Sequence, residues 1–235
     1  MVVHFQNFPP SEPVSSVRIP AKGEDRAAAQ RSLRSPYRLF FKRFLDVSLI
    51  ILSLPVVLPV VALMALLAAL DGSSPFYRQE RVGKDGRIFN LLKIRTMVPH
   101  ADAQLEAYLE RNPTVKHEWE ETQKLKQDPR ITRFGRFLRK TSLDELPQLW
   151  NVLKGDMSIV GPRPMMVDQQ SLYPGKAYYL LRPGITGPWQ VSDRNHGTFA
   201  GRAKYDADYY VDLSLATDLS ILLRTVAVVV RGTGY

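Results

Sequence analysis

The sequence predicts an α+β fold: a mostly helical cytoplasmic domain with a small sheet, anchored by a proline-broken re-entrant membrane helix and by interfacial amphipathic helices. Three observations lead to this prediction. Residues 47–70 form an uncharged apolar run, the glycine-containing segment 81–95 has apolar alternation, and much of the remaining chain has helical periodicity. We expect three parts: a mobile basic tail (1–36), a basic approach with the re-entrant helix (37–71), and a cytoplasmic domain (72–235).

The composition narrows the class of partner. Lys and Arg total 32 and Asp and Glu total 23, so the net charge is +9. Such a charge suits an anionic partner, which can be a nucleic acid, a membrane surface or a phosphorylated substrate. The chain has no cysteine, which excludes a disulfide framework, a cysteine-ligated zinc site and thiolate catalysis. With 45% hydrophobic residues over 235 positions, the chain can bury one sizeable core.

The first 36 residues are rich in proline and lack a sustained apolar period. They contain five of the 17 prolines, which predicts a mobile tail. No apolar segment with a small-residue cleavage site follows the start of the chain, so we do not expect a signal peptide. Residues 1–43 carry eight Lys or Arg and three Asp or Glu. More than half of the net charge therefore precedes the apolar run.

The apolar run Val47–Leu70 has two interpretations. As a straight helix it would be about 36 Å long, enough to cross a bilayer, so a single spanning helix is one of them. However, Pro55 and Pro59 lie near its midpoint, where each removes a backbone donor and kinks a helix. Basic residues also flank the run on both sides, and such residues favour the cytoplasmic side. We therefore favour a helix that breaks in its middle and leaves by the face it entered.

The elements after the run are predicted from turn residues and periodicity. Residues 81–95 predict turns followed by a short strand. Residues 101–126 predict two polar helices separated at Asn112-Pro113. Residues 130–153 and 203–231 are predicted to be mostly helical, with a loop region rich in glycine and proline between them. In the last helix, apolar residues at helical spacing fit an interfacial or a core helix equally well: Leu219, Leu222, Leu223 and Val226.

Two adjacent carboxylates lie at the start of a helix predicted to begin near Ser142. Ser142 and Glu145 match a capping box, and Gly155 is a typical C-terminal stop. Because Pro147 is best tolerated in a first turn, Asp144 can be the cap instead. Acidic residues are common at such a position, where they stabilise the helix dipole by about 0.3–1 kcal/mol. Capping alone is therefore one explanation of the pair, and chemistry on a phosphate is the other.

Arginines recur every three residues just upstream of the pair, with a lysine beside the last one and no acidic residue among them. On a helix this spacing predicts a basic stripe, and most of it fits an interfacial helix on anionic headgroups. Its last arginine lies five residues before Asp144 and can reach a phosphate at the same helix end. The stripe consists of Arg130, Arg133, Arg136, Arg139 and Lys140.

Three loops hold further arginines among prolines and glycines, at residues 161–164, 181–189 and 192–195. Proline fixes the backbone and glycine lets it turn, and a guanidinium held in this way offers two parallel donors to phosphate oxygens. An ordinary turn explains any one of these loops. Three of them beside a carboxylate pair predict a phosphate-handling site. Trp189, in the second loop, is a candidate for stacking on a base or a sugar.

With these motifs in view, the sequence resembles a known family, the monotopic polyprenol-phosphate phosphoglycosyl transferases, or bacterial sugar transferases. The likeness covers about residues 40–235, and among members the sequence looks most like the exopolysaccharide-initiating undecaprenyl-phosphate hexose-1-phosphate transferases. The motifs that carry it follow in order along the chain: Lys42-Arg43, Asp46, Pro59, 93–97, 142–148, 151–157, 161–164 and 182–187.

The resemblance implies an enzyme, a phosphoglycosyl transferase. It would transfer a hexose-1-phosphate, galactose or glucose, from a UDP-sugar to undecaprenyl phosphate, release UMP, and pass through a covalent aspartyl-phosphosugar intermediate. Exopolysaccharide or other surface-glycan synthesis would begin with this step. By position, Asp144 resembles the nucleophile, Glu145 the magnesium-holding residue, and Pro59 the break in the re-entrant helix. Family positions that line the site for substrate and phosphate are matched by Lys93, Arg139, Arg163, Arg194 and Asp206.

The same resemblance implies Mg²⁺ as cofactor, and the UDP-sugar, undecaprenyl phosphate and membrane lipids as partners. It is also compatible with a homo-oligomer. It implies a location at the bacterial inner membrane, with the catalytic domain on the cytoplasmic face. Two departures from the family pattern lie in the loop expected to sense the sugar or nucleotide, Pro188 after Gly187 and Asp193 before Arg194.

Two other classes of function fit parts of the sequence. One is a non-catalytic, membrane-anchored adaptor whose basic surface binds lipid headgroups; magnesium-dependent turnover of a UDP-sugar would separate the transferase from it. The other is nucleic-acid binding, which charge alone suggests. Because the sequence has no recognition helix, zinc finger or aromatic ribonucleoprotein motif, we expect no nucleic-acid partner.

Overall fold

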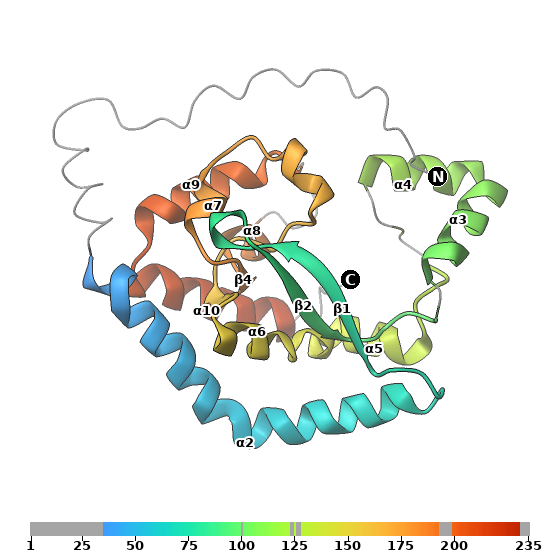
Figure 1. Cartoon of the computed structure of the whole chain (residues 1–235), viewed down its shortest axis with the longest axis horizontal. Helices are drawn as coiled ribbons and strands as arrows, with labels where there is room; N and C mark the ends of the chain where they lie inside the picture. The colour runs from blue at the N-terminus through green and yellow to red at the C-terminus, as the bar shows by residue number, and fades with distance from the viewer. Residues whose placement is uncertain (1–34, 100, 123–124, 126–127, 193–198, 231–235) are drawn as a thin grey trace.

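The structure is a computed structural model that describes residues 35–99, 101–122, 125, 128–192 and 199–230. It is mostly helical and has two small two-stranded sheets, in agreement with the predicted α+β class (Figure 1). Almost all of the predicted tail lies outside the described residues. In chain order the elements are η1 (Tyr37–Phe41), α2 (Lys42–Ala69), β1 (Phe76–Val82), η2 (Lys84–Gly86), β2 (Ile88–Ile94), α3 (Ala101–Arg111), α4 (Pro113–Thr122), α5 (Arg133–Thr141), η3 (Leu143–Glu145), α6 (Gln148–Lys154), β3 (Ser158–Val160), η4 (Asp168–Leu172), α7 (Ala177–Leu180), β4 (Gly184–Thr186), α8 (Pro188–Val191), α9 (Arg202–Asp212) and α10 (Leu215–Val230).

The apolar run lies in one long helix, α2, which bends about midway along its length (Figure 1). Together with η1 it covers Tyr37–Ala69 and is long and apolar enough to cross a membrane. Pro55 and Pro59 lie inside α2, which remains one continuous helix. The structure therefore has a bend where the sequence predicted a break. An internal proline removes a hydrogen bond and crowds the preceding turn, which kinks a helix and need not end it.

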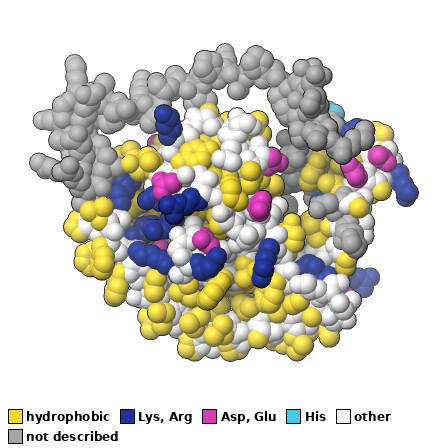
Figure 2. Space-filling view, in the orientation of Figure 1, with side chains coloured by type: hydrophobic (Ala, Val, Ile, Leu, Met, Phe, Trp, Pro, Cys, Tyr) yellow, Lys and Arg dark blue, Asp and Glu magenta, His cyan; other side chains and the backbone are white. Residues whose placement is uncertain are grey.

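Both arms of α2 pack against the same domain, whereas the middle of the helix is exposed. In the first arm, Ile50 belongs to a core cluster with Leu91 of β2. In the second arm, Met64 belongs to another cluster with Leu138 of α5. Between the arms, the Leu52 side chain is 77% exposed. Figure 2 shows hydrophobic side chains gathered along the lower edge of the molecule, where α2 lies.

Polar contacts also tie each end of α2 to the domain. At its start, Lys42 Nζ lies 2.5 Å from Asp218 Oδ2 of α10, and Asp218 accepts a further hydrogen bond from the Tyr209 hydroxyl (2.6 Å). At its end, Arg95 Nη2 donates to the carbonyl oxygen of Ala68 (2.7 Å). The beginning and the end of the apolar helix are thus fixed on one body.

The first sheet is the antiparallel hairpin β1–β2, paired from Phe76 with Ile94 to Val82 with Ile88. Its turn contains Asp85 in the left-handed region, at φ 58°. The strand predicted within residues 81–95 is β2. The sequence does not predict β1, because most of its side chains are polar or exposed and show no alternating burial. The hairpin carries Lys93 of β2 to the turn that holds the two carboxylates.

The second sheet is a parallel pair, β3–β4, in which two Gly/Pro motifs cross at close range. A Cβ atom on Gly161 would lie 2.3 Å from the carbonyl oxygen of Arg182, and one on Gly184 would lie 2.1 Å from the nitrogen of Gly161. Only glycine fits at both positions. The crossing fixes the loop that holds Arg163 beside the segment that leads into α8.

The remaining helices follow the predicted pattern. The two polar helices are α3 and α4, which separate at Pro113 as predicted, and the helical segment predicted over 203–231 contains α9 and α10. In α10, Ile221 is buried whereas Leu219 and Leu223 are exposed. Three of the four residues on which the two interpretations rest are therefore exposed, Leu219, Leu223 and Val226; these three do not support a core helix, and an interfacial position of α10 stays a prediction.

Candidate active site

The two adjacent carboxylates lie in a turn between two helices and not at a helix cap. Ser142 ends α5 in the left-handed conformation (φ 58°) and makes no capping hydrogen bond with its side chain. Asp144 and Glu145 form the following 3₁₀ turn, and Pro147 precedes the first residue of α6. The predicted capping box is therefore wrong, and so is Asp144 as cap. Ser142 ends α5 and lies six residues before Gln148, where α6 begins, so it is too far away to cap α6.

One part of the helix prediction is confirmed. Gly155 ends α6 at φ 91°, and its N–H contacts the carbonyl oxygens of the last turn. Pro147 has no backbone N–H to donate, so a short helix accommodates it best at or just before its beginning. This explains why α6 starts after Pro147, and why the carboxylates stay in the connecting turn.

Four of the predicted site residues meet at this turn, which we call the carboxylate cluster: Asp144, Glu145, Lys93 and Arg139. Lys93 Nζ of β2 lies 2.8 Å from Glu145 Oε1. Arg139, in the last turn of α5, donates from Nε to Thr96 Oγ1 (2.9 Å). Asp144 is only 6% exposed. Three separate elements thus bring two cations and two carboxylates to one place.

Burial and charge set the protonation of Asp144. The pKa of Asp144 is raised to about 6, chiefly by burial and also by the neighbouring Glu145, whereas Lys93 and Arg139 oppose the shift. Burial also lowers the pKa of Arg139. At neutral pH the Asp144 carboxyl is therefore mostly ionised, although a small change in its surroundings would protonate it.

The basic stripe divides into inward and outward members. Arg139 faces the carboxylate cluster, and the buried Arg130 pairs with Asp128, with Nη2 2.6 Å from Oδ2. Arg133 and Arg136 are exposed, as is Lys140. A three-residue step turns a helix by about 300°, so such a row winds around the axis. Only the exposed members keep the predicted role of a surface that can contact headgroups.

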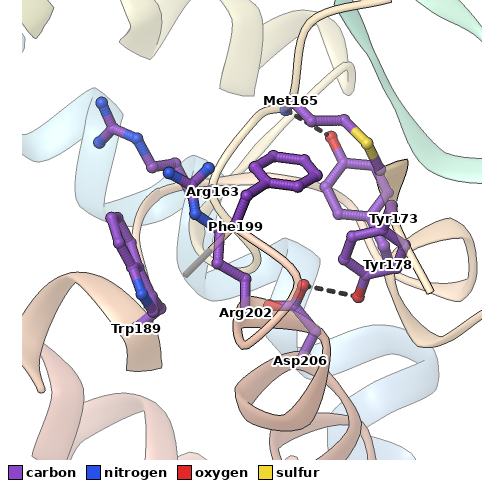
Figure 3. Close-up of a pocket in the computed structure, with 8 residues that line it drawn as sticks. All are labelled: Arg163, Met165, Tyr173, Tyr178, Trp189, Phe199, Arg202 and Asp206. Carbon is purple, nitrogen blue, oxygen red and sulfur yellow. Dashed lines mark hydrogen bonds between the residues drawn. The ribbon is translucent and has the colours of Figure 1, made fainter. Parts of the chain in front are cut away.

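A second group of side chains, which we call the Asp206 cluster, lines a small pocket (Figure 3). It consists of Arg163, Met165, Tyr173, Tyr178, Trp189, Phe199, Arg202 and Asp206. The Tyr173 hydroxyl donates to Asp206 Oδ2 of α9 (2.8 Å). The Arg202 guanidinium carbon lies 4.2 Å from the ring centre of Trp189, and that of Arg163 lies 6.0 Å from it. The pocket thus combines guanidinium groups with an aromatic face.

The Asp206 cluster carries more positive than negative charge. Burial raises the pKa of Asp206 to about 7 and lowers that of Arg202 to about 10. Repulsion from Arg163 and Arg81 contributes to the lowered pKa of Arg202, so three guanidinium groups lie near one another, and Arg202 also acts on the single carboxyl group of Asp206. Such an arrangement favours the binding of an anion.

The short helix α8 separates this pocket from a second, larger one. Trp189 lines the pocket of the Asp206 cluster, whereas Gln190 lines a groove of about 150 Å³ that reaches Glu145. Within the described residues, Trp189 Nε1 and Gln190 Oε1 are buried without a hydrogen-bond partner. The Trp189 nitrogen can donate a hydrogen bond to a bound molecule, and the Gln190 oxygen can accept one. The groove walls are mainly aliphatic and include Leu146, Leu149, Ile185, Val191 and Val228.

The structure thus distributes the predicted site residues over two clusters. Lys93, Arg139, Asp144 and Glu145 are in the first, Arg163 and Asp206 are in the second, and Pro59 lies in the bent region of α2. Arg194 lies outside the described residues.

Sequence reasoning did not identify Thr96, Arg81, Tyr173 or Arg202 as site residues. Arg202 stands four residues before Asp206, a spacing that places both on one helix face. This spacing could have pointed to Arg202. Arg81 and Tyr173 come from a strand and from the segment after a 3₁₀ helix, and no local pattern links them to Asp206.

The two carboxylates fit a magnesium ion. Among the described residues, no group of three or more His, Cys, Asp and Glu side chains could hold a metal ion by itself. Mg²⁺, however, commonly takes one or two carboxylates and completes its shell with water and substrate phosphates. Asp144 and Glu145 supply two oxygen ligands at adjacent positions, and their repulsion raises the pKa of Asp144. A divalent cation would relieve that repulsion.

Comparison with known proteins gives a consistent result. Residues 37–232 match the family model described as bacterial sugar transferase. The "UDP-galactose-lipid carrier transferase" of Erwinia amylovora is 45% identical over 197 residues, which are 83% of this chain and 41% of that protein. The "Exopolysaccharide production protein ExoY" of Sinorhizobium fredii is 44% identical over 196 residues, 82% of this chain and 87% of that protein.

A third relative is the "Undecaprenyl-phosphate galactose phosphotransferase" of Salmonella typhimurium, 43% identical over 207 residues, which are 87% of this chain and 44% of that protein. The chain therefore spans less than half the length of the Erwinia and Salmonella proteins and most of the length of the Sinorhizobium protein.

Proposed function

The chain belongs to the bacterial sugar transferase family, and we propose that it transfers a hexose-1-phosphate from a UDP-sugar to undecaprenyl phosphate and releases UMP. The names of its relatives support this proposal. The name of the Erwinia protein mentions UDP-galactose and a lipid carrier, and that of the Salmonella protein mentions undecaprenyl phosphate and galactose. The name of the Sinorhizobium protein mentions exopolysaccharide production. We take galactose or glucose as the hexose, and the initiation of exopolysaccharide or other surface-glycan synthesis as the role.

The carboxylate cluster is the observation that carries the proposal. Asp144 is buried and mostly ionised at neutral pH, and Lys93 and Arg139 compensate part of its charge. A carboxylate in such surroundings can act as a nucleophile toward phosphorus. The two cations also reduce the repulsion that an anionic nucleophile meets when it approaches a diphosphate.

In the first step, an Asp144 carboxylate oxygen attacks the β-phosphorus of the UDP-sugar. The bond between that phosphorus and the oxygen that bridges to the α-phosphate breaks, and UMP leaves with the bridging oxygen. The sugar phosphate stays on Asp144 as an acyl phosphate. Lys93 and Arg139 are placed to stabilise the charge that develops on the phosphoryl oxygens.

In the second step, a phosphate oxygen of undecaprenyl phosphate attacks the phosphorus of the adduct. The bond to Asp144 breaks, the carboxylate is restored, and the sugar is left on a lipid-linked diphosphate. Dividing the transfer in this way lets one set of cations serve two anionic substrates in turn. Donor and acceptor therefore need not be bound at the same time.

We propose Glu145 as the residue that holds Mg²⁺. When bound, the ion would neutralise diphosphate charge and orient the leaving group. Glu145 is itself oriented by Lys93, at 2.8 Å.

We assign the Asp206 cluster to the donor nucleotide. Its excess of guanidinium groups suits the nucleotide's α-phosphate, and the aromatic face of Trp189 suits a base or a sugar. The contact of Arg202 with Trp189 supports this assignment, because it keeps a buried cation beside the ring. The Tyr173–Asp206 hydrogen bond would then hold α9 in place beneath the nucleotide.

We propose that α2 dips into one leaflet and leaves by the same face, with the domain on the cytoplasmic side. The bend, the exposed middle and the attachment of both ends to one domain support this arrangement. The basic residues on both flanks also favour a single side. The carboxylate cluster would then lie close to the headgroups, where a soluble donor and a lipid acceptor can both reach it.

The test is a panel of UDP-sugars, each supplied with Mg²⁺ and undecaprenyl phosphate to the purified protein in vesicles. We expect UMP release with one hexose donor and, without acceptor, an intact mass increased by one hexose phosphate. The Asp144→Asn variant should show neither, whereas Asp212→Asn, at an exposed position of α9, should show both. Headgroup binding without UMP release from any donor would instead identify an anchored adaptor.

A further inference from the structure

The groove between α6, α8 and α10 has the chemistry of a lipid site. It has a volume of about 150 Å³, and most of its walls are aliphatic. An apolar cavity of about this size in another protein binds benzene, which is close in size to one isoprene unit. The groove therefore has room for a short apolar segment of a larger molecule.

One end of the groove reaches the carboxylate cluster. Glu145 lines the groove together with Leu146, the next residue in the chain. A molecule in the groove would therefore place its end beside Lys93, which lies 2.8 Å from Glu145, and near Arg139. A suitable occupant has an anionic head for these cations and an apolar body for the groove.

Away from the carboxylate cluster, the groove is bordered by apolar side chains that lie near α2 or are exposed. Leu149, on its wall, packs against the core cluster that contains Ile50 of α2. Val229, near the end of α10, lines the groove and is 41% exposed. Figure 1 shows α6 and α10 on the side of the domain that faces α2. A chain that leaves the groove can therefore continue into a membrane that surrounds α2.

We propose that this groove binds the phosphate-proximal isoprene unit of the polyprenyl phosphate acceptor. The inference rests on the proposed function, to which it adds the binding site of the acceptor. A hexose fits this surface less well, because Leu146, Leu149, Ile185 and Val228 offer its several hydroxyl groups no partner, and the unpartnered Gln190 Oε1 can accept from few of them. The Thr186 and Thr225 hydroxyls on the wall already bond to each other (2.7 Å) and need no ligand.

The first experiment fills the groove. Val228→Trp replaces a half-buried wall residue with a larger side chain, and Ala227→Trp places the same side chain at the adjacent exposed position outside the groove. We expect Val228→Trp to raise the KM for undecaprenyl phosphate about tenfold or more. The amount of UMP released without acceptor should stay at the wild-type level, because that step does not use the lipid. Ala227→Trp should change neither quantity.

Two results of this experiment would overturn the inference. One is an acceptor KM in Val228→Trp equal to that of Ala227→Trp. The other is a raised KM for the UDP-sugar with an unchanged acceptor KM, which would place the sugar or nucleotide in the groove.

A second experiment uses the wild-type protein and so does not depend on the folding of a variant. A polyprenyl phosphate with a photoreactive group on its first isoprene unit is bound in vesicles and irradiated, and the labelled peptide is identified by mass spectrometry. Label on α6, α8 or the end of α10 supports the inference, and label confined to α2 contradicts it. Because labelling requires no turnover, it can succeed even if no UDP-sugar releases UMP, the result that would refute the proposed function.

Discussion

Asp144 and Asp206 are both buried aspartates, 6% and 3% exposed, but their surroundings differ. Burial raises the pKa of Asp144 to about 6 and that of Asp206 to about 7. Asp144 lies in a connecting turn beside a second carboxylate, and the cations Lys93 and Arg139 favour its ionised form. Asp206 lies in the middle of α9 and accepts a hydrogen bond from Tyr173. Burial raises both pKa values, and the neighbours decide whether a carboxylate can attack or serves as a fixed partner.

The largest expected effect separates the two aspartates by their covalent chemistry. Asp144→Asn should reduce turnover by about a thousandfold or more and abolish the phosphosugar adduct, because an amide cannot replace the attacking carboxylate. Asp206→Asn should leave donor binding nearly unchanged and still form the adduct, since Asn keeps an oxygen that accepts from Tyr173 and no cation of the cluster is lost. Intact-mass measurement with donor alone checks both variants. An adduct on the Asp144→Asn protein would refute the assignment.

A smaller effect is expected when one neighbour of Asp144 is removed. Lys93→Met should lower kcat by about a hundredfold, since a cation that stabilises the developing charge is lost. Because Lys93 lowers the pKa of Asp144, the acid side of the pH–rate profile should also move to higher pH. Lys84→Met, in the exposed hairpin turn, is the matched control. If the profile does not move, Lys93 is not a neighbour that tunes Asp144.

The pH dependence of the wild type follows from the same carboxyl group. Asp144 must be ionised to attack, and its pKa is raised to about 6, so kcat/KM should fall below about pH 6. The decrease should approach tenfold per pH unit, as for a single essential ionisation. Initial rates of UMP release from about pH 4 to about pH 8, roughly two units on either side of this pKa, test the prediction. An acid side centred near pH 4 would mean that burial does not govern Asp144.

The smallest of these effects concerns stability and has the opposite sign from activity. The folded pKa of Asp144 lies above the ordinary 3.8, so the folded protein binds the proton more readily, and ionisation above about pH 6 opposes folding. At 1.36 kcal/mol per pKa unit, the cost is about 3 kcal/mol. Asp144→Asn should therefore raise the Tm by roughly 6–12 °C at pH 8. This gain should shrink as the pH falls from about 6 toward 4, and a gain independent of pH would contradict the explanation.

Patterns among residues close in sequence predict several helix boundaries and most of the carboxylate cluster well. The apolar run, the separation at Pro113 and the stop at Gly155 each depend on residues close in sequence, and the structure has all three. Asp144 and Glu145 are adjacent, and Arg139 lies five residues away, so three members of the carboxylate cluster also come from one segment.

The parts that depend on distant contacts were predicted less well. Ser142 fits a capping box by spacing, but α5 continues to Thr141 and uses Ser142 for its own end. The stripe of arginines divides because Arg139 pairs with Thr96, 43 residues away. Arg81 and Tyr173 reach the surroundings of Asp206 from a strand and a loop, through packing that no spacing in the sequence encodes.

The bent helix α2 has a consequence for the lipids in which the protein works. A straight span must match the full hydrocarbon thickness, and any excess or deficit of length carries a free-energy cost. A hairpin held at both ends and confined to one leaflet never meets the opposite headgroups. If α2 is the one-leaflet hairpin that we propose, lengthening the acyl chains of the host vesicles should leave the turnover rate nearly constant, whereas a bilayer-crossing anchor would respond with tilt or mismatch.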